Sequence, residues 1–237
     1  MTRVGKLVLG GVIVIALLAA GGWWLVSSRG SDSPAPAALG NAPPATTSKA
    51  GSAQAGSSGT VEGAWKVQDG GDSFVGYRVR EQLAFLQSPS DAVGRTRAVS
   101  GNLRVAGDKL ETATIQADLT QLTSDQSRRD NAIRQQGLQS DQFPTASFQL
   151  AQPITLPAEL ARGQTIQADA KGRLTVHGTT RDVTLPLRGR WNGDTIQVAG
   201  ALKIAMTDYG IQPPRLGPVV SIDDAATMEV QLVFQRG

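Results

Sequence analysis

Apolar and polar residues alternate with a period of two over most of the chain after residue 63. The clearest stretch is Arg173–Trp191, where the alternation stops at the Gly178-Thr179-Thr180-Arg181 connection and then resumes. Its apolar positions are Leu174, Val176, Val183, Leu185 and Leu187. Period-two patterning on both sides of a short Gly/Thr connection predicts an antiparallel β-hairpin with one buried face.

The same pattern recurs along the chain and predicts eight strands. They are Ser73–Arg80, Arg97–Ala106, Leu110–Leu119, Thr145–Gln152, Gln164–Val176, Asp182–Trp191, Thr195–Met206 and Thr227–Gln235. Turn residues separate them at Gly107-Asp108, at Gly178 and at Asn192-Gly193, where we expect a type I′ turn.

Eight alternating antiparallel strands close either as a sandwich or as an up-and-down barrel. We favour an all-β, eight-stranded antiparallel barrel, because the hairpins are consecutive and eight strands can enclose one small ligand.

Two segments interrupt the strand pattern. Thr123–Leu138 fits a short helix that caps one end of the barrel, with a capping box from Thr123 to Gln126 and Gly137 at its end. The second segment, Glu81–Gly94, carries an apolar cluster within a long connection. It is interpreted either as a lid over the barrel mouth or as a loop that packs on the barrel.

The N-terminal region predicts export. After a short cytoplasmic stretch, residues 1–6, the uncharged segment Leu7–Val26 matches the roughly 20 residues that span a bilayer. Trp23 and Trp24 suit a membrane interface, so we expect a transmembrane signal anchor. The alternative is a cleaved signal peptide with small residues at its cleavage site, which would give a secreted protein. In either case the folded domain lies on the extracytoplasmic side.

Composition changes abruptly after the apolar segment. Residues 27–62 are rich in Ser, Gly, Ala and Pro, which predicts a disordered linker because little apolar surface is available to offset its ordering entropy. Residues 63–237 then form the predicted barrel domain. We therefore expect a single barrel on a flexible tether.

Composition and charge exclude several kinds of protein. The chain has no cysteine, so it has no disulfide, thiolate metal site or catalytic thiol. Its formal charge of +3 comes from the region before residue 61, while the domain is balanced, which argues against nucleic-acid binding. His177 is the single histidine and faces away from the apolar row, so we expect a structural or surface role. The sequence predicts no enzyme, no cofactor and no metal.

Four segments, in order, resemble the YceI-like family. They are Trp65-Lys66-Val67 with Asp72-Ser73-Phe74, then Leu122–Asp130, then Phe143–Phe148, and then Gly172–Val183. The length of the Glu81–Gly94 connection departs from the family pattern. So does Met206–Gly210, which lacks the expected arginine.

The resemblance implies a lipocalin-like barrel whose lumen holds a polyisoprenoid chain, either a quinone or a polyprenyl carrier. The alternation then assigns the inward-facing, ligand-binding positions. They are Val75, Tyr77, Val79, Leu103, Ile115, Leu119, Phe148, Leu174, Val176, Leu185, Leu187, Val198, Leu202 and Val230. The same residues would also fill a solid core, which would suit a structural or protein-interaction module of the cell envelope.

Candidate polar contacts at the mouth are Arg129, Asp130 and Tyr209. Arginine binds phosphate through two parallel hydrogen bonds, so Arg129 is a candidate for an anionic head group. The alternative is that Asp130 and an arginine tie the helix to a neighbouring strand. The expected partners are an isoprenoid lipid and the membrane, while the pattern leaves the oligomeric state open.

Overall fold

The computed structural model describes residues 33–40, 60–84, 87–214, 217 and 219–237. The predicted anchor, residues 7–26, and most of the predicted linker lie outside these ranges. Within them, no helix is long and apolar enough to cross a membrane. Residues 33–40 belong to the predicted linker and are described as an extended stretch.

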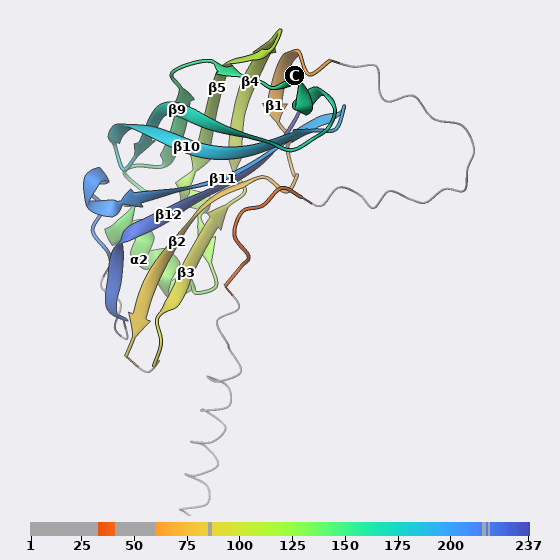
Figure 1. Ribbon diagram of the computed structural model, residues 1–237. Helices are drawn as coiled ribbons and strands as arrows, with labels where there is room; N and C mark the ends of the chain where they lie inside the picture. The colour runs from red at the N-terminus through yellow and green to blue at the C-terminus, as the bar shows by residue number, and fades with distance from the viewer. Residues whose placement is uncertain (1–32, 41–59, 85–86, 215–216, 218) are drawn as a thin grey trace, which may run out of the picture. The chain divides into compact units, whose positions relative to one another are not determined.

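The folded domain consists of strands with a few short helices (Figure 1). The strands are β1 (Gly63–Val67), β2 (Phe74–Leu83), β3 (Ser90–Thr96), β4 (Val99–Ala106), β5 (Lys109–Asp118), β6 (Thr123–Ser124), β7 (Thr145–Leu150), β8 (Ile154–Thr155), β9 (Ile166–Val176), β10 (Thr179–Trp191), β11 (Thr195–Ala205) and β12 (Val219–Arg236). The helical segments are η1 (Leu119–Gln121), α2 (Ser127–Ala132), the π-helix η2 (Ile133–Gly137), α3 (Ala158–Ala161) and η3 (Met206–Tyr209).

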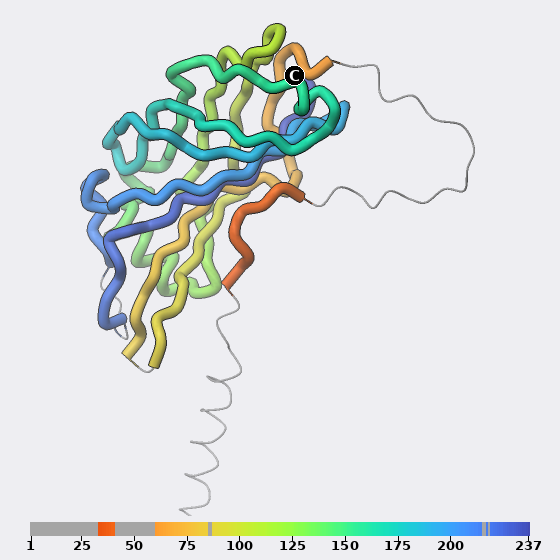
Figure 2. Tube along the Cα trace, viewed as in Figure 1, coloured from red at the N-terminus to blue at the C-terminus, as the bar shows by residue number. Residues whose placement is uncertain are grey.

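Eight antiparallel strands close into a barrel in the order β1-β4-β5-β7-β9-β10-β11-β12, and β1 pairs with β12 to complete the ring. Strand β12 is long enough to pair with β2 over most of its length and with β1 near its end. Strand β2 pairs with the first part of β12 and, on its other edge, with β3, so this hairpin lengthens the wall on one side (Figure 2). The predicted barrel is therefore confirmed.

All eight predicted strands are present. The interpretation of Glu81–Gly94 as a lid or loop is wrong for the parts of the segment that form strands, while Phe85 and Leu86 of its apolar cluster lie outside the described residues. This segment contributes the end of β2 and most of β3, which pair as a hairpin. Its inner face carries the small residues Ala92 and Gly94, so it lacks the large apolar residues that mark the other strands. Gly94 is required there, because an added Cβ would lie 2.4 Å from the Tyr77 ring.

The turns also differ from the prediction. His177 and Gly178 both have positive φ, 50° and 71°, as a type I′ turn requires, and β10 begins immediately afterwards at Thr179. At Asn192-Gly193 only the glycine has positive φ, so the predicted type I′ turn is wrong. Instead, the Asn192 carboxamide oxygen accepts a hydrogen bond from the Thr195 N–H (2.8 Å).

The predicted helix is present but begins later, at Ser127. It continues into the π-helix η2 and ends at Gly137, as expected. The capping box is wrong, because Gln126 makes no side-chain cap and Thr123 lies in β6. The start of the helix is held by Asp130 instead. Its carboxylate accepts hydrogen bonds from the Ser124 N–H (2.9 Å) and hydroxyl (2.6 Å).

The buried apolar residues form two clusters inside the barrel. One surrounds Trp65 and Phe234, near the end where β1 closes the ring. The other includes Leu174 together with Met206 and Tyr209 of η3. Leu202 packs against both clusters, so the core is continuous along the barrel.

Candidate ligand-binding site

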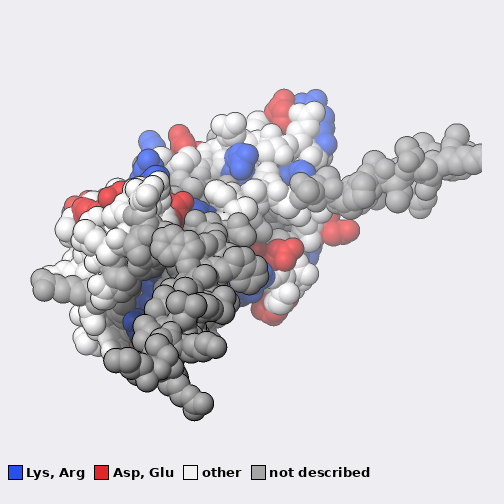
Figure 3. Space-filling model, turned by 90° about the horizontal axis from the view of Figure 1, so that it is seen from below, with Lys and Arg blue, Asp and Glu red and all other residues white. Residues whose placement is uncertain are grey.

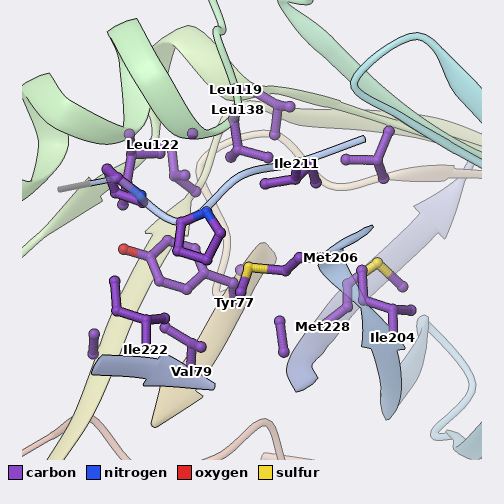
Figure 4. Close-up of a pocket in the computed structure, with 18 of the residues that line it drawn as sticks. Tyr77, Val79, Leu119, Leu122, Leu138, Ile204, Met206, Ile211, Ile222 and Met228 are labelled. Carbon is purple, nitrogen blue, oxygen red and sulfur yellow. The ribbon is translucent and has the colours of Figure 1, made fainter. Parts of the chain in front are cut away.

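A cavity of about 120 Å³ lies at the α2 end of the barrel. Its lining is almost entirely apolar and comes from β2, β11, β12, the π-helix and the segment that follows η3 (Figure 4). In this view Ile222 and Val79 lie on one side, and Leu119, Leu122 and Leu138 lie on the other. The segment from Leu119 to Leu138, which contains α2 and the π-helix, therefore forms one wall of a hollow whose other wall is the barrel.

Two further apolar cavities continue along the barrel. The second has a volume of about 100 Å³ and shares Val75, Ala146 and Met228 with the first. The third, of about 70 Å³, shares Leu103 and Leu187 with the second. The cavities are thus adjacent chambers, and side chains narrow the passage between them.

A larger hollow of about 460 Å³ lies outside this series. It is lined by the loop Gln68–Gly71 and by polar residues near Arg97 and Asp118. Its lining is about as polar as it is apolar, so it offers no continuous surface for an apolar chain.

The predicted inward-facing residues lie where the alternation placed them. All of them except Leu202 line the first or the second cavity. Leu202 is partly buried between the two core clusters. Val75 lines both cavities and therefore marks the boundary between the chambers.

Arg129 supplies the first polar group of the cavity. It is 6% exposed, and its Nη2 donates to Glu81 Oε1 at 2.7 Å, which ties α2 to β2. Its Nη1 donates to Asp125, one turn earlier in the chain. Burial lowers the pKa of Arg129, but the carboxylates of Glu81 and Asp125 together outweigh this effect and hold the pKa above its usual value. The Nε–H of Arg129 is buried and has no partner among the described residues.

Tyr77 supplies the second polar group. It projects from β2 into the same cavity, and its hydroxyl is buried without a hydrogen-bond partner among the described residues. Burial raises the pKa of Tyr77 well above its usual range, while Arg129 lowers it by a smaller amount. The phenol is therefore neutral and can donate a hydrogen bond.

The other candidate mouth residues are placed differently. The Asp130 carboxylate accepts a hydrogen bond from the Ser124 N–H and so ties α2 to β6. This is a contact between the helix and a strand, the alternative to a contact with a ligand head group. Tyr209 is 2% exposed and does not line any of the three cavities. Burial also raises its pKa.

His177 makes structural contacts rather than facing a cavity. Its Nδ1 lies 3.1 Å from the Tyr209 carbonyl oxygen, and its Nε2 lies 3.3 Å from Gln139 Oε1. Its ring centroid lies 4.4 Å from that of Phe143. No group of three metal-ligating side chains occurs within the described ranges.

Sequence reasoning did not select several residues of the first cavity. Glu81 continues the inward series Val75, Tyr77, Val79, so its position on the inner face was readable from the period of two. Met228 belongs to an alternating strand and gave the same signal. Ile211, Pro213 and Pro214 come from an irregular segment whose course has no periodic signature.

Charged side chains are mixed on the domain surface. In Figure 3 acidic and basic groups are interspersed over the visible face, without a large area of one sign. This distribution agrees with the balanced charge of the domain and gives that face no basic footprint for nucleic acid.

The model of a family described as YceI-like domain matches residues 65–234. A polyisoprenoid binding domain from Saccharophagus degradans, implicated in plant cell wall breakdown, superposes with a TM-score of 0.59 at 18% identity, covering 74% of this chain and all of that one. BcnA from Burkholderia cenocepacia gives a TM-score of 0.55 at 18% identity, covering 68% of this chain and 95% of that one. No curated protein matches the chain.

Proposed function

The chain belongs to the YceI-like domain family, and we propose that its barrel holds the chain of one isoprenoid lipid, with the lipid's polar end at Tyr77 and Arg129. One observation carries the proposal. Apolar chambers lie in series, and among their described lining residues the two buried donors without a partner, the Tyr77 hydroxyl and the Arg129 Nε–H, both belong to the first chamber. The polyisoprenoid binding domain of Saccharophagus degradans has the same fold, which supports this ligand class.

The energetics favour a long apolar chain. Each buried CH₂ contributes about 0.8 kcal/mol, so ten buried carbons contribute roughly 8 kcal/mol before ordering costs. The three chambers together approach the ~300 Å³ at which ligand pockets begin, and the constrictions between them must open further. Met228, at the first constriction, is suited to this because its unbranched side chain adopts many shapes.

The polar end favours a neutral hydrogen-bond acceptor over a phosphate. The Arg129 charge is already matched by Glu81 and Asp125, so an added anion would meet two carboxylates and one guanidinium. The free donors are the Tyr77 hydroxyl and the Arg129 Nε–H. A quinone or other carbonyl oxygen satisfies both groups without adding charge.

The N-terminal sequence supports a location for this activity. The apolar segment Leu7–Val26 and the linker that follows it suit a barrel tethered to the outer face of the membrane. The proposal is therefore an extracytoplasmic carrier or store for a membrane isoprenoid. Protease protection in intact cells tests the location, and degradation of the barrel only after lysis would contradict it.

Native mass spectrometry of gently purified full-length protein tests the binding. We expect a co-purifying lipid, or uptake of an added quinone with an isoprenoid tail at one per chain. A lipid-free mass that does not change on titration would refute the proposal. Tyr77→Phe should weaken quinone binding about 5- to 150-fold, equivalent to the ~1–3 kcal/mol of leaving the buried carbonyl acceptor of the quinone without its donor. Binding of a headless isoprenoid hydrocarbon should not change.

The small volume of each chamber favours a second candidate, a packed structural module of the envelope. Leu187→Trp distinguishes the two, because Leu187 lines the second and third chambers. A ligand tube loses lipid binding but remains folded, with an unchanged thermal midpoint to within a few degrees. A packed core instead loses stability by roughly 1–3 kcal/mol through overpacking.

A further inference from the structure

Residues 35–40 lie in an extended form against the outer wall of the barrel, although their composition is that of a linker (Figure 2). Three contacts hold them, and all three use main-chain atoms of the segment. Arg95 of β3 donates to the Ala35 carbonyl, the Ala38 N–H donates to Gln231 Oε1 of β12 (3.2 Å), and Arg190 of β10 donates to the Gly40 carbonyl (2.6 Å). The segment thus spans several adjacent strands.

The side chains that hold the segment are themselves fixed by the barrel. Arg95 Nη2 also donates to Glu229 Oε2 (3.0 Å), and its guanidinium lies 4.1 Å from the Phe74 ring centroid. Glu229 points away from the barrel interior, because its neighbours on β12, Met228 and Val230, line the second cavity. Its side chain is nevertheless only 1% exposed. Arg78 completes its pairing at 2.9 Å.

The other two contacts are supported in the same way. Gln231 Nε2 donates to the Asp72 carbonyl (3.2 Å), which leaves its oxygen directed toward Ala38. Arg190 Nη2 donates to Gln197 Oε1 (2.7 Å) as well as to Gly40. These donors and acceptors are therefore positioned by partners within the barrel, and ordering them costs little when the segment docks.

We propose that the outer wall around Arg95, Gln231 and Arg190 is a docking surface for the chain's own residues 35–40, which latches the linker to the barrel. Recognition through main-chain atoms suits an Ala/Pro-rich segment, because small side chains allow its backbone to approach the wall. Ala37 and Leu39 are partly buried and alternate with exposed neighbours, so one side of the extended segment faces the barrel.

The latch changes the reach of the tether, a consequence that rests on the proposed membrane anchor. Without it, the predicted linker of residues 27–62 separates anchor and barrel. With it, only residues 27–34 do so, and they extend to at most ~29 Å at ~3.6 Å per residue. The chain then leaves the barrel at Arg95 on β3 rather than at β1.

The absence of cysteine makes a direct test simple, since two introduced cysteines carry the only spin labels. Pro36→Cys and Ala201→Cys place nitroxides on the segment and on the outer face of β11, and both positions are exposed. In the full-length protein we expect a narrow distance distribution by pulsed electron paramagnetic resonance. A broad distribution would overturn the proposal.

Variants then identify the contacts responsible. Ala38→Pro removes the N–H that bonds Gln231, and Arg190→Ala removes the contact with Gly40. Together they should broaden the distribution, whereas the matched controls Ala50→Pro in the linker and Arg188→Ala on the same face of β10 should leave it narrow. A narrow distribution in the double variant would show that these contacts do not hold the segment. Lipid content, measured by native mass spectrometry on the same samples, reports separately on the proposed function.

Discussion

The buried pair between Arg129 and Glu81 allows a quantitative test of the structure. Their side chains are 7% and 3% exposed and their charged atoms are 2.7 Å apart. Removing one partner leaves a charge buried without compensation, which costs about 3–5 kcal/mol in a protein interior. The second partner of Arg129, Asp125, is 69% exposed and contributes little, because exposed pairs are worth at most about 1 kcal/mol.

We therefore expect Arg129→Met and Glu81→Leu each to lower the free energy of unfolding by about 3–5 kcal/mol. The double variant replaces the pair with apolar side chains in an apolar cavity, and should recover most of that loss. Urea denaturation of the four proteins, followed by far-UV circular dichroism, measures the cycle. Single-variant losses below about 1 kcal/mol, the value for an exposed pair, would refute the burial of this pair.

Two further predictions concern the β9–β10 turn and Tyr77. Gly178→Ala should lower the free energy of unfolding by about 1–3 kcal/mol, since φ is +71° and the new Cβ would lie 2.8 Å from the Phe143 ring. The control Gly107→Ala also has positive φ but would meet no atom within 4 Å, so it should lower the free energy of unfolding by less. Equal losses for the two variants in urea denaturation would contradict the predicted clash. The pKa of Tyr77 is higher in the folded protein than in the unfolded chain, where it is about 10. The contribution of the neutral phenol to stability is therefore complete below about pH 10 and is lost as the pH rises above that value, because the unfolded chain then releases the proton first. Tyr77→Phe should therefore lose less stability than the parent between pH 9 and pH 11, and parallel pH profiles would count against a buried phenol.

The sequence predicted the barrel because most strands alternate large apolar and polar residues, which only a one-sided sheet explains. Four strands were missed. Strands β6 and β8 have only two residues each, too few to show a period of two. Strand β1 is short and follows a linker, and β3 presents Ala92 and Gly94 on its inner face, so it lacks the usual contrast. Close contact with Tyr77 explains why those residues are small, but that contact is a tertiary property.

The cavity was only partly predictable. The residues that the period of two assigned to the inner faces line the first two cavities, apart from Leu202, because each strand's inner face is set by its own alternation. It did not predict the chamber volumes, which depend on how opposite walls interdigitate. It also did not pair Arg129 with Glu81, because the two are brought together only when α2 packs against β2.

The ion pair and the cavity have a common physical explanation. A helix with few apolar residues needs a strong contact to stay over the barrel, and Arg129 provides it by bonding Glu81 on the inner face of β2. The same geometry leaves the Arg129 Nε–H buried without an acceptor among the described residues, and the hydroxyl of Tyr77, which lines the same cavity, is also unpartnered. Leaving two donors unsatisfied costs stability, and a neutral acceptor on a bound lipid would recover that cost. The Arg129→Met/Glu81→Leu double variant separates the two roles: it should remain folded, hold a headless hydrocarbon as well as the parent does, and bind an isoprenoid quinone more weakly.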